Sequence, residues 1–553
     1  MSTRKQVAVV TGGGGGIGAA IAEELGREGW FVVTVDPLVT LDGSERLPEP
    51  SETTAARIVA AGGSARASNV SVTDADAVRC LFDELVDTHG GLDAVVNVAG
   101  ITRQTGFAHG TEEDWLAVLT VHLAGYLNVL GAALPLMADA GHGRILGVTS
   151  GSGWRAADAG AYSCAKRAVA AITWQLGAHS PPGVTVNAMS PIAATRMVAA
   201  AIERARQQGR AGGGGGLSLN SMPGPEHLGP LGAHLVARDF GWCTGRVFFA
   251  GGSEVAVVDQ PRVLEVVRTE GVVSVDWVLQ QVIPRAFATA ESNQTSGGGG
   301  NPRFGSIFDE PAGPPPVSTG VRTCAVVTDR ALMGASISEA LEARSVTCHR
   351  IESGKGFRAA SDAMGALVEA VGPVDAVIVA PAGPRPVETA TADWERLLAG
   401  HSRIVEQIHS DAGWARAVAD YAAGAARPVK LVTLTDAVTP AGRSRAQAAA
   451  QLARVAAATT EGRVSAFTAS IEAPEAQVAG PVGHLVAHLL SDPDAAPLAG
   501  AELVVGPGWL GLRGHPRPMG TVVFGGPAVP PWLDPALQEM VGATVDSRPV
   551  GVG

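Results

Sequence analysis

The sequence has few cysteines and no basic cluster, and these absences exclude several classes of protein. Five of its 553 residues are cysteine, and none forms a Cys-x-x-Cys pair. This usage argues against a disulfide scaffold or a metal site, and we expect a reducing, cytoplasmic environment. Acidic residues outnumber basic ones by 53 to 41, so the net charge is −12. An acidic chain without a basic run is a poor partner for nucleic acid or for an anionic membrane.

Long apolar runs and a signal peptide are also missing. No uninterrupted apolar run reaches the roughly 18 residues of a membrane span, and the opening MSTRKQVAVVTGG leads directly into an expected strand. Hydrophobic residues make up 46% of the chain and charged residues 17%, which is typical of folded domains with large cores. The length predicts more than one domain.

A glycine run stands between a strand and a helix near the start of the chain. Thr11–Gly18 reads TGGGGGIG, after the β-branched run Val7–Val10 and before the helical pattern Ala19–Leu25. Trp30–Val35 is the next expected strand. In this setting, glycines let the backbone approach a diphosphate and the helix N-terminus receives its charge. The stretch therefore predicts a dinucleotide-binding unit.

Asp36 closes the second expected strand, where an acidic side chain binds the ribose hydroxyls of a dinucleotide. A carboxylate there would repel a 2′-phosphate, and the glycine turn contains no arginine to attract one. We therefore expect NAD rather than NADP. The alternative is an ordinary turn aspartate before Pro37.

Ser150, Tyr162 and Lys166 are the candidate chemical groups. Tyr162 and Lys166 are four residues apart in an expected helix and so share a face. A nearby ammonium group lowers the pKa of a phenol, so the pair can move the proton of an alcohol. Ser150 follows the expected strand Arg144–Ser150 and can hold the substrate oxygen. Alone, Tyr-x-x-x-Lys also occurs on ordinary helices; the motifs around it favour the functional interpretation.

Strands and helices alternate throughout the first half. Leu92–Val96, Arg144–Ser150 and Val184–Asn187 are expected strands, and Trp115–Leu134 is an expected helix. Such alternation predicts a doubly wound α/β fold, with a parallel sheet covered on both faces.

Taken in order over residues 5 to 260, these motifs resemble the short-chain dehydrogenase/reductase family. The segments EDWLAVLTVHLAGY, GAYSCAK and SPIAATRM are similar to the (3R)-hydroxyacyl-CoA dehydrogenase part of peroxisomal multifunctional enzyme type 2 and its bacterial relatives. The resemblance implies a cofactor site made by Thr11, Gly12, Gly16, Ile17, Gly18, Asp36, Asn69, Val70, Asn97, Ala99, Gly100, Tyr162, Lys166, Pro191 and Thr195.

The same resemblance implies the catalytic roles. Tyr162 takes the hydroxyl proton, Lys166 lowers the tyrosine pKa and orients the ribose, and Ser150 holds the oxygen. His122, which stands where most of the family has asparagine, links Lys166 to solvent. Thr195 holds the carboxamide or the phosphates of the cofactor. Further departures are Asn69 in place of an aspartate, Ile192 in place of a glycine, and a loop between Ser150 and Tyr162 that is one residue short.

The implied function is an NAD-dependent interconversion of a secondary alcohol and a ketone. The resemblance implies a 3-hydroxyacyl-CoA or a bulky alicyclic or steroid-like alcohol as substrate. One alternative is a ketoreductase of a biosynthetic, polyketide-like pathway. Another is a non-catalytic dinucleotide-sensing or interaction protein, which would normally have lost Tyr162 or Lys166.

The second half repeats the first without its chemistry. We expect a catalytic domain over 1–285, a Gly/Pro/Ser-rich linker over 286–320 and a degenerate copy over 321–553. Ser444 and Ala448 stand where the copy should carry Tyr162 and Lys166. We therefore expect two tandem doubly wound domains, the second catalytically inactive.

The copy also suggests how the chain assembles. Its alanine-rich helices are suited to cover apolar helices of the first half, giving an internal pseudo-dimer, and two chains would form a homodimer of four domains. Arg196–Gly229, which carries five consecutive glycines, is expected to be a mobile segment over the substrate.

Overall fold

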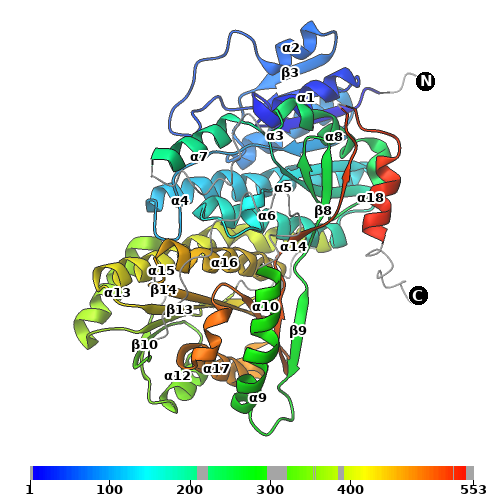
Figure 1. Ribbon diagram of the computed structural model, residues 1–553. Coiled ribbons are helices and arrows are strands. Elements are labelled where there is room, and N and C mark those ends of the chain that lie inside the picture. Colours follow the sequence, from blue (N-terminus) through cyan, green and yellow to red (C-terminus); the bar gives the residue numbers. More distant parts are fainter. Residues whose placement is uncertain are drawn as a thin grey trace.

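Two helix-covered sheets make up the computed structural model (Figure 1), which describes residues 4–207, 222–295, 320–352, 354, 356–383, 392–526 and 528–542. The central strands of both sheets are parallel, and helices connect them. The predicted fold class, two tandem doubly wound α/β units, is therefore confirmed.

The first sheet has nine strands in the order β17-β8-β7-β6-β5-β4-β1-β2-β3. Its strands are β1 Val7–Thr11, β2 Phe31–Val35, β3 Ser64–Ser68, β4 Ala94–Asn97, β5 Gly143–Val148, β6 Val184–Pro191, β7 Val247–Gly251, β8 Glu254–Asp259 and β17 Arg517–Val523. Its longer helices are α1 Gly16–Arg27, α2 Thr54–Ala60, α3 Ala75–His89, α4 Glu112–Leu119, α5 Gly125–Ala140, α6 Gly160–His179, α7 Arg196–Gln207 and α8 Gly229–His234, and η1 Thr120–Ala124 is a π-helical turn between α4 and α5.

The second sheet has eight strands in the order β11-β10-β12-β13-β14-β15-β16-β9. They are β9 Val263–Arg268, β10 Thr323–Val327, β11 Thr347–Ile351, β12 Ala376–Val379, β13 Val429–Asp436, β14 Val464–Ile471, β15 Glu502–Gly506 and β16 Trp509–Arg513. The helices around it are α9 Val275–Val282, α10 Ala288–Thr295, α12 Ala331–Glu342, α13 Gly356–Val371, α14 Asp393–Gly400, α15 Ile404–Gly424, α16 Pro440–Thr459 and α17 Glu475–Ser491, with the short turns η6 Ile283–Phe287 and η8 His401–Arg403.

The two halves exchange their last strands. β9 follows β8 in the chain but pairs with β16, and β17 follows β16 but pairs with β8. Each exchanged strand takes the next helix with it. In Figure 1, green α9 and α10 lie with the yellow and orange half, whereas red α18 (Leu533–Gly542) lies with the first half.

Sheet membership therefore differs from the predicted boundaries at 285 and 321. Leu279, Ile283 and Phe287 belong to the core of the second half, and Leu533 and Leu537 belong to the core of the first. The sequence pattern missed this because an edge strand has the same alternation whichever sheet it joins. Of the predicted linker, residues 288–295 form α10 and residues 296–319 lie outside the described residues.

One apolar core joins the halves. It contains α3, α4, α5 and α6 of the first unit together with α13, α15 and α16 of the second. The continuous helix Glu112–Ala140 is long and apolar enough to span a membrane by length and composition, but more than half of its most apolar window is buried. Trp115, Leu123 and Leu130 on this helix belong to the shared core. Helices of the second half thus pack against the apolar helices of the first, as predicted.

Candidate active site

The predicted cofactor residues meet at the carboxyl ends of the parallel strands, which is where such sheets bind nucleotides. Thr11 ends β1 and Asn97 ends β4, and the Thr11 hydroxyl donates to Asn97 Oδ1 at 2.8 Å. The same hydroxyl accepts a hydrogen bond from Ala99 N at 3.2 Å. These contacts hold the glycine turn against the segment that contains Ala99 and Gly100.

The glycine turn is too tight for side chains. Gly12 has a φ of +65°, and a Cβ atom there would lie 2.9 Å from Ala99 N. A Cβ atom on Gly18 would lie 2.2 Å from the Gly12 carbonyl oxygen. α1 begins at Gly16, with Ile17 and Gly18 in its first turn. The backbone N–H groups at the start of α1 are therefore open to an anion, which fits a dinucleotide diphosphate.

Asp36 lies beside this turn, as predicted. Its Oδ2 accepts from Gly14 N at 3.2 Å and its Oδ1 accepts from Leu38 N at 2.9 Å. Asn69 and Val70 follow β3, next to the strand that Asp36 ends, so both lie at the adenosine side of the predicted site. The carboxylate is thus fixed where ribose hydroxyls would bind.

Arg196 is a neighbour of the turn that sequence reasoning missed. A Cβ atom on Gly15 would lie 3.3 Å from Arg196 Nη2, and one on Gly16 would lie 3.8 Å from Thr195 Cγ2. Arg196 is exposed at the start of α7. The turn itself contains no arginine, but the fold brings one to Gly15 from 181 residues downstream. Arg196 follows β6 in the chain, and its position beside the turn is known only once the fold brings this segment next to the start of α1.

The three candidate catalytic side chains lie together where β5 ends and α6 begins. Ser150 lies close enough to Tyr162 for its hydroxyl to lower the pKa of the phenol. Lys166 Nζ lies 5.6 Å from the centre of the Tyr162 ring and donates to the Val148 carbonyl oxygen at 2.6 Å. Thr149 Oγ1 donates to the Lys166 carbonyl oxygen at 2.6 Å. The end of β5 is therefore bonded to both the side chain and the backbone of Lys166 on α6.

Burial controls the protonation of these groups. Lys166 is 4% exposed, and burial lowers its pKa to about 7. Within the described part of the chain, no carboxylate is paired with it. Burial also raises the pKa of Tyr162, and the Ser150 hydrogen bond opposes that rise. Desolvation is the largest cause of the shift at both groups, and the role of Lys166 in lowering the tyrosine pKa stays a prediction.

His122 is buried in the π-helical turn η1, within the wall of the site. Its Nε2 lies 2.7 Å from the Ile101 carbonyl oxygen, and a Cβ atom on Gly100 would lie 2.3 Å from His122 Cε1. The ring packs edge-on against Tyr162 at 5.0 Å between centroids. Burial, and then the charge of Lys166, lower the His122 pKa to about 3, so the imidazole is neutral. Nε2 also lies 3.2 Å from the Ile101 N–H, and Nδ1 is buried without a partner among the described residues.

Pro191 ends β6, and Thr195 lies just before α7, opposite the glycine turn. Thr195 Oγ1 accepts a hydrogen bond from Val198 N at 3.3 Å. Of the predicted mobile segment, Arg196–Gln207 is helix α7 and Pro225–Leu228 is a 3-10 turn, whereas 208–221 lie outside the described residues.

The corresponding positions of the second half are occupied differently. Ser444 is buried in α16, where its hydroxyl contacts His401 Nε2 at 2.9 Å. Glu475 from α17 accepts a hydrogen bond from Met333 N in the first turn of α12 and pairs with Arg330 at 3.2 Å. A carboxylate thus lies where the first half has an open helix N-terminus, and it would repel a diphosphate.

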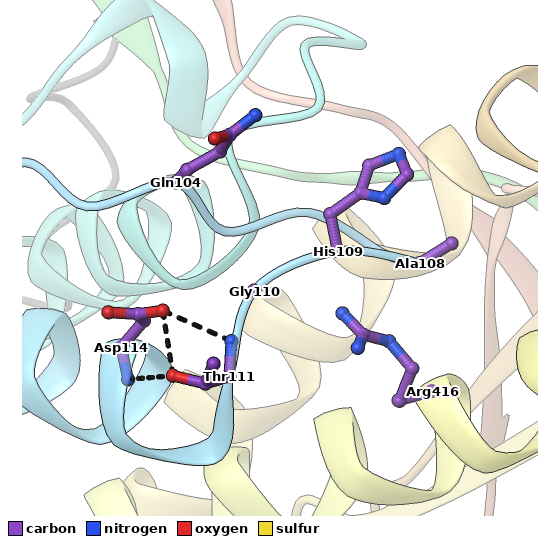
Figure 2. Close-up of a pocket in the computed structure, with 7 residues that line it drawn as sticks. All are labelled: Gln104, Ala108, His109, Gly110, Thr111, Asp114 and Arg416. Carbon is purple, nitrogen blue, oxygen red and sulfur yellow. Dashed lines mark hydrogen bonds between the residues drawn. The ribbon is translucent and has the colours of Figure 1, made fainter.

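A separate cavity of about 500 Å³ lies where the loop before α4 meets the second half (Figure 2). The Thr111–Asp114 capping box forms its floor, and the Arg416 guanidinium reaches toward it from α15. None of the predicted catalytic side chains lines it. The lining residues are Gln104, Ala108, His109, Gly110, Thr111, Asp114 and Arg416.

The chain matches known proteins mainly through its first half. The family model described as short chain dehydrogenase matches residues 6–206. The short-chain reductase protein NovJ of Streptomyces niveus is 38% identical over 36% of this chain and 74% of that protein. Acetoacetyl-CoA reductase of Cupriavidus necator is 32% identical over 45% of this chain and 97% of its own length.

Two further comparisons concern larger proteins. The peroxisomal hydratase-dehydrogenase-epimerase of Neurospora crassa is 30% identical over 45% of this chain, and the match spans 26% of that protein. The solved N-domain, with NADP, of a bacterial malonyl-CoA reductase has a TM-score of 0.63 and covers 90% of this chain and 97% of its own, at 15% identity. This last likeness supports the fold of both halves together.

Proposed function

The chain belongs to the short-chain dehydrogenase family, whose members are oxidoreductases of hydroxyl and keto groups, and from this we propose an NAD-dependent interconversion of a secondary alcohol and a ketone in its first half. The observation that carries the proposal is the arrangement of Ser150, Tyr162 and Lys166 beside an open, glycine-lined helix N-terminus.

In oxidation, Tyr162 Oη removes the proton of the substrate hydroxyl, and in reduction it returns that proton. Ser150 Oγ orients the substrate oxygen and, by lowering the pKa of Tyr162, favours the phenolate. Lys166 Nζ, when protonated, favours the phenolate and holds the ribose. Neutral His122, whose Nδ1 has no partner among the described residues, relays protons between Lys166 and solvent. When bound, the nicotinamide accepts or donates the hydride.

The residues at the glycine turn fit a nicotinamide dinucleotide. Asp36 fits ribose hydroxyls better than a 2′-phosphate, which favours NAD. Arg196 beside Gly15 fits the diphosphate, which both cofactors share. Thr11, Asn97 and Thr195 complete the walls of this pocket.

For the substrate, we propose a 3-hydroxyacyl-CoA or a bulky alicyclic or steroid-like alcohol. The acyl-CoA class agrees with the names of two relatives, an acetoacetyl-CoA reductase and a peroxisomal hydratase-dehydrogenase-epimerase. A biosynthetic ketoreductase uses the same residues in the reducing direction and is the second candidate, which the short-chain reductase relative favours.

We propose that the second half is catalytically inactive, because Ser444 and Ala448 replace the tyrosine and lysine and Glu475 blocks the helix N-terminus. Two chains would then pair as a homodimer of four domains. All five cysteines are free thiols, in keeping with a proposed cytoplasmic location.

The test is a spectrophotometric screen at 340 nm. Purified protein is incubated with NAD or NADP and a panel of 3-hydroxyacyl-CoA thioesters and alicyclic alcohols, and the reverse direction uses the ketones with NADH or NADPH. We expect turnover with NAD or NADH in at least one class. Absence of turnover in both directions, or a preference for NADP over NAD, would contradict the proposal.

A further inference from the structure

The loop that carries Ser150 is held by the second half of the chain. Gln451 Nε2, on α16, donates to the carbonyl oxygens of Ser152 at 3.0 Å and Arg155 at 2.7 Å. Arg454 Nη1, one turn further along the same helix, donates to the Trp154 carbonyl oxygen at 2.9 Å. Three carbonyls within the five residues after Ser150 thus have their donors on α16.

Gln451 is itself fixed in this orientation. Its side chain is 1% exposed, and its Oε1 accepts from Arg167 Nη1 at 3.1 Å. Because a guanidinium only donates and a carbonyl only accepts, the amide can satisfy its partners in one orientation alone. Arg167, the residue after Lys166, also bonds Gln447 Oε1 at 3.0 Å and pairs with buried Glu502 at 3.4 Å. The network connects the catalytic helix to the second sheet.

The opposite side of the loop rests on the first half. A Cβ atom on Gly153 would lie 2.8 Å from Arg167 N and 3.0 Å from the Lys166 carbonyl carbon, so the loop contacts the backbone of α6 directly. Trp154 Nε1 donates to Ser190 Oγ at 3.2 Å. The loop therefore lies between α6, the end of β6 and α16, and its path depends on both halves.

From this arrangement we propose that Gln451 and Arg454 are positioning residues, which hold the Ser150 hydroxyl at Tyr162 from within the inactive half. This inference rests on the proposed function. These carbonyls are partly buried, and without their donors on α16 they would favour a rearranged loop. A displacement of about 1 Å at a catalytic group can lower turnover about 100-fold. The second half would then complete the active site as well as cover an apolar face.

Gln447 provides the matched control, because it lies one turn before Gln451 and belongs to the same network. It bonds Arg167 and Glu502 but, within the part of the chain that the structure describes, none of the loop carbonyls. Gln451→Leu should lower kcat about 10- to 100-fold, while Gln447→Leu stays within about threefold of the unmodified enzyme. The affinity for NADH, measured by fluorescence, should change little in either variant.

A second pair of variants tests Arg454 and leaves Gln451, Gln447 and Arg167 unchanged. Arg454→Met should lower kcat, and Arg454→Lys, which retains a donor near the Trp154 carbonyl, should recover part of the loss. If Gln451→Leu fails to fold, this pair still decides the question, because a merely structural side chain would not give partial kinetic rescue.

Hydrogen exchange supplies a readout that needs no substrate. Gly153 N donates to the Ser150 carbonyl at 2.9 Å and Arg155 N to the Gly151 carbonyl at 3.0 Å, so both amides report the loop conformation. They should exchange faster in Gln451→Leu than in Gln447→Leu. Equal kcat and equal exchange in the two variants would overturn the inference. If the unmodified protein turns over no alcohol or ketone, the proposed function fails, and the exchange comparison still judges whether α16 holds the loop.

Discussion

Replacing Lys166 by methionine should abolish turnover and stabilise the cofactor-free protein. Burial lowers the Lys166 pKa from 10.5 to about 7, which means that the folded state disfavours the ammonium group. At about 1.4 kcal/mol for each pKa unit, this corresponds to about 5 kcal/mol of destabilisation when the amine is protonated. Methionine removes the charge and keeps most of the apolar volume.

The gain in stability expected for Lys166→Met is reduced by the loss of one hydrogen bond. Lys166 Nζ donates to the Val148 carbonyl, and loss of a buried hydrogen bond costs about 1 kcal/mol. We therefore expect Lys166→Met to raise the free energy of unfolding by about 3 to 4 kcal/mol at pH 6. The difference should depend on pH. Below about pH 7 the destabilisation is complete; as the pH rises toward 10.5, the folded state loses its proton first and the difference shrinks.

Urea denaturation of cofactor-free protein at pH 6 and pH 9 measures both quantities. Lys430→Met is the control, because Lys430 is a buried lysine of the second half that donates to the Leu489 and Leu490 carbonyls. Burial lowers its pKa as well, but Asp492 opposes the shift. The control should gain less stability and keep its turnover. A Lys166→Met protein that is less stable than the unmodified one at pH 6, or a gain independent of pH, would refute the reasoning.

Four further outcomes follow from the site and the interface. Tyr162→Phe should keep the fold and NADH binding while kcat falls by orders of magnitude in the absorbance assay; near-native turnover would exclude it as the base. Asp36→Ala should weaken the binding of NAD and strengthen the binding of NADP in fluorescence titrations. An unchanged ratio of the two affinities would show that Asp36 does not select the cofactor. Glu502→Gln leaves the buried charge of Arg167 poorly compensated and should lower the free energy of unfolding by about 3 to 5 kcal/mol in urea denaturation. An unchanged free energy of unfolding would show that the pair does not stabilise the fold. Calorimetric titration should give one NAD per chain, since Glu475 occupies the second helix N-terminus; two equal sites would contradict this.

Much of the first half follows from local pattern. The glycine turn, Asp36 and the Tyr162–Lys166 spacing were predictable because each depends on residues close in sequence. The order of strands and helices was predictable for the same reason, and Ser444 and Ala448 at the positions of Tyr162 and Lys166 could be read from the sequence. Proximity of these groups in one site follows from a parallel sheet, whose strands all end at one edge.

Other features depend on contacts between distant segments. The exchange of β9 and β17 could not be predicted, because the sequence pattern of an edge strand is the same whichever sheet it joins. Arg196 reaches the glycine turn, and Gln451 reaches the Ser150 loop, through packing across 181 and 299 residues of chain. The protonation of Lys166 and Tyr162 likewise depends on burial. The sequence by itself determined which chemical groups the protein carries; the tertiary structure decided which are desolvated and which segment holds them, because both depend on neighbours far away in the chain.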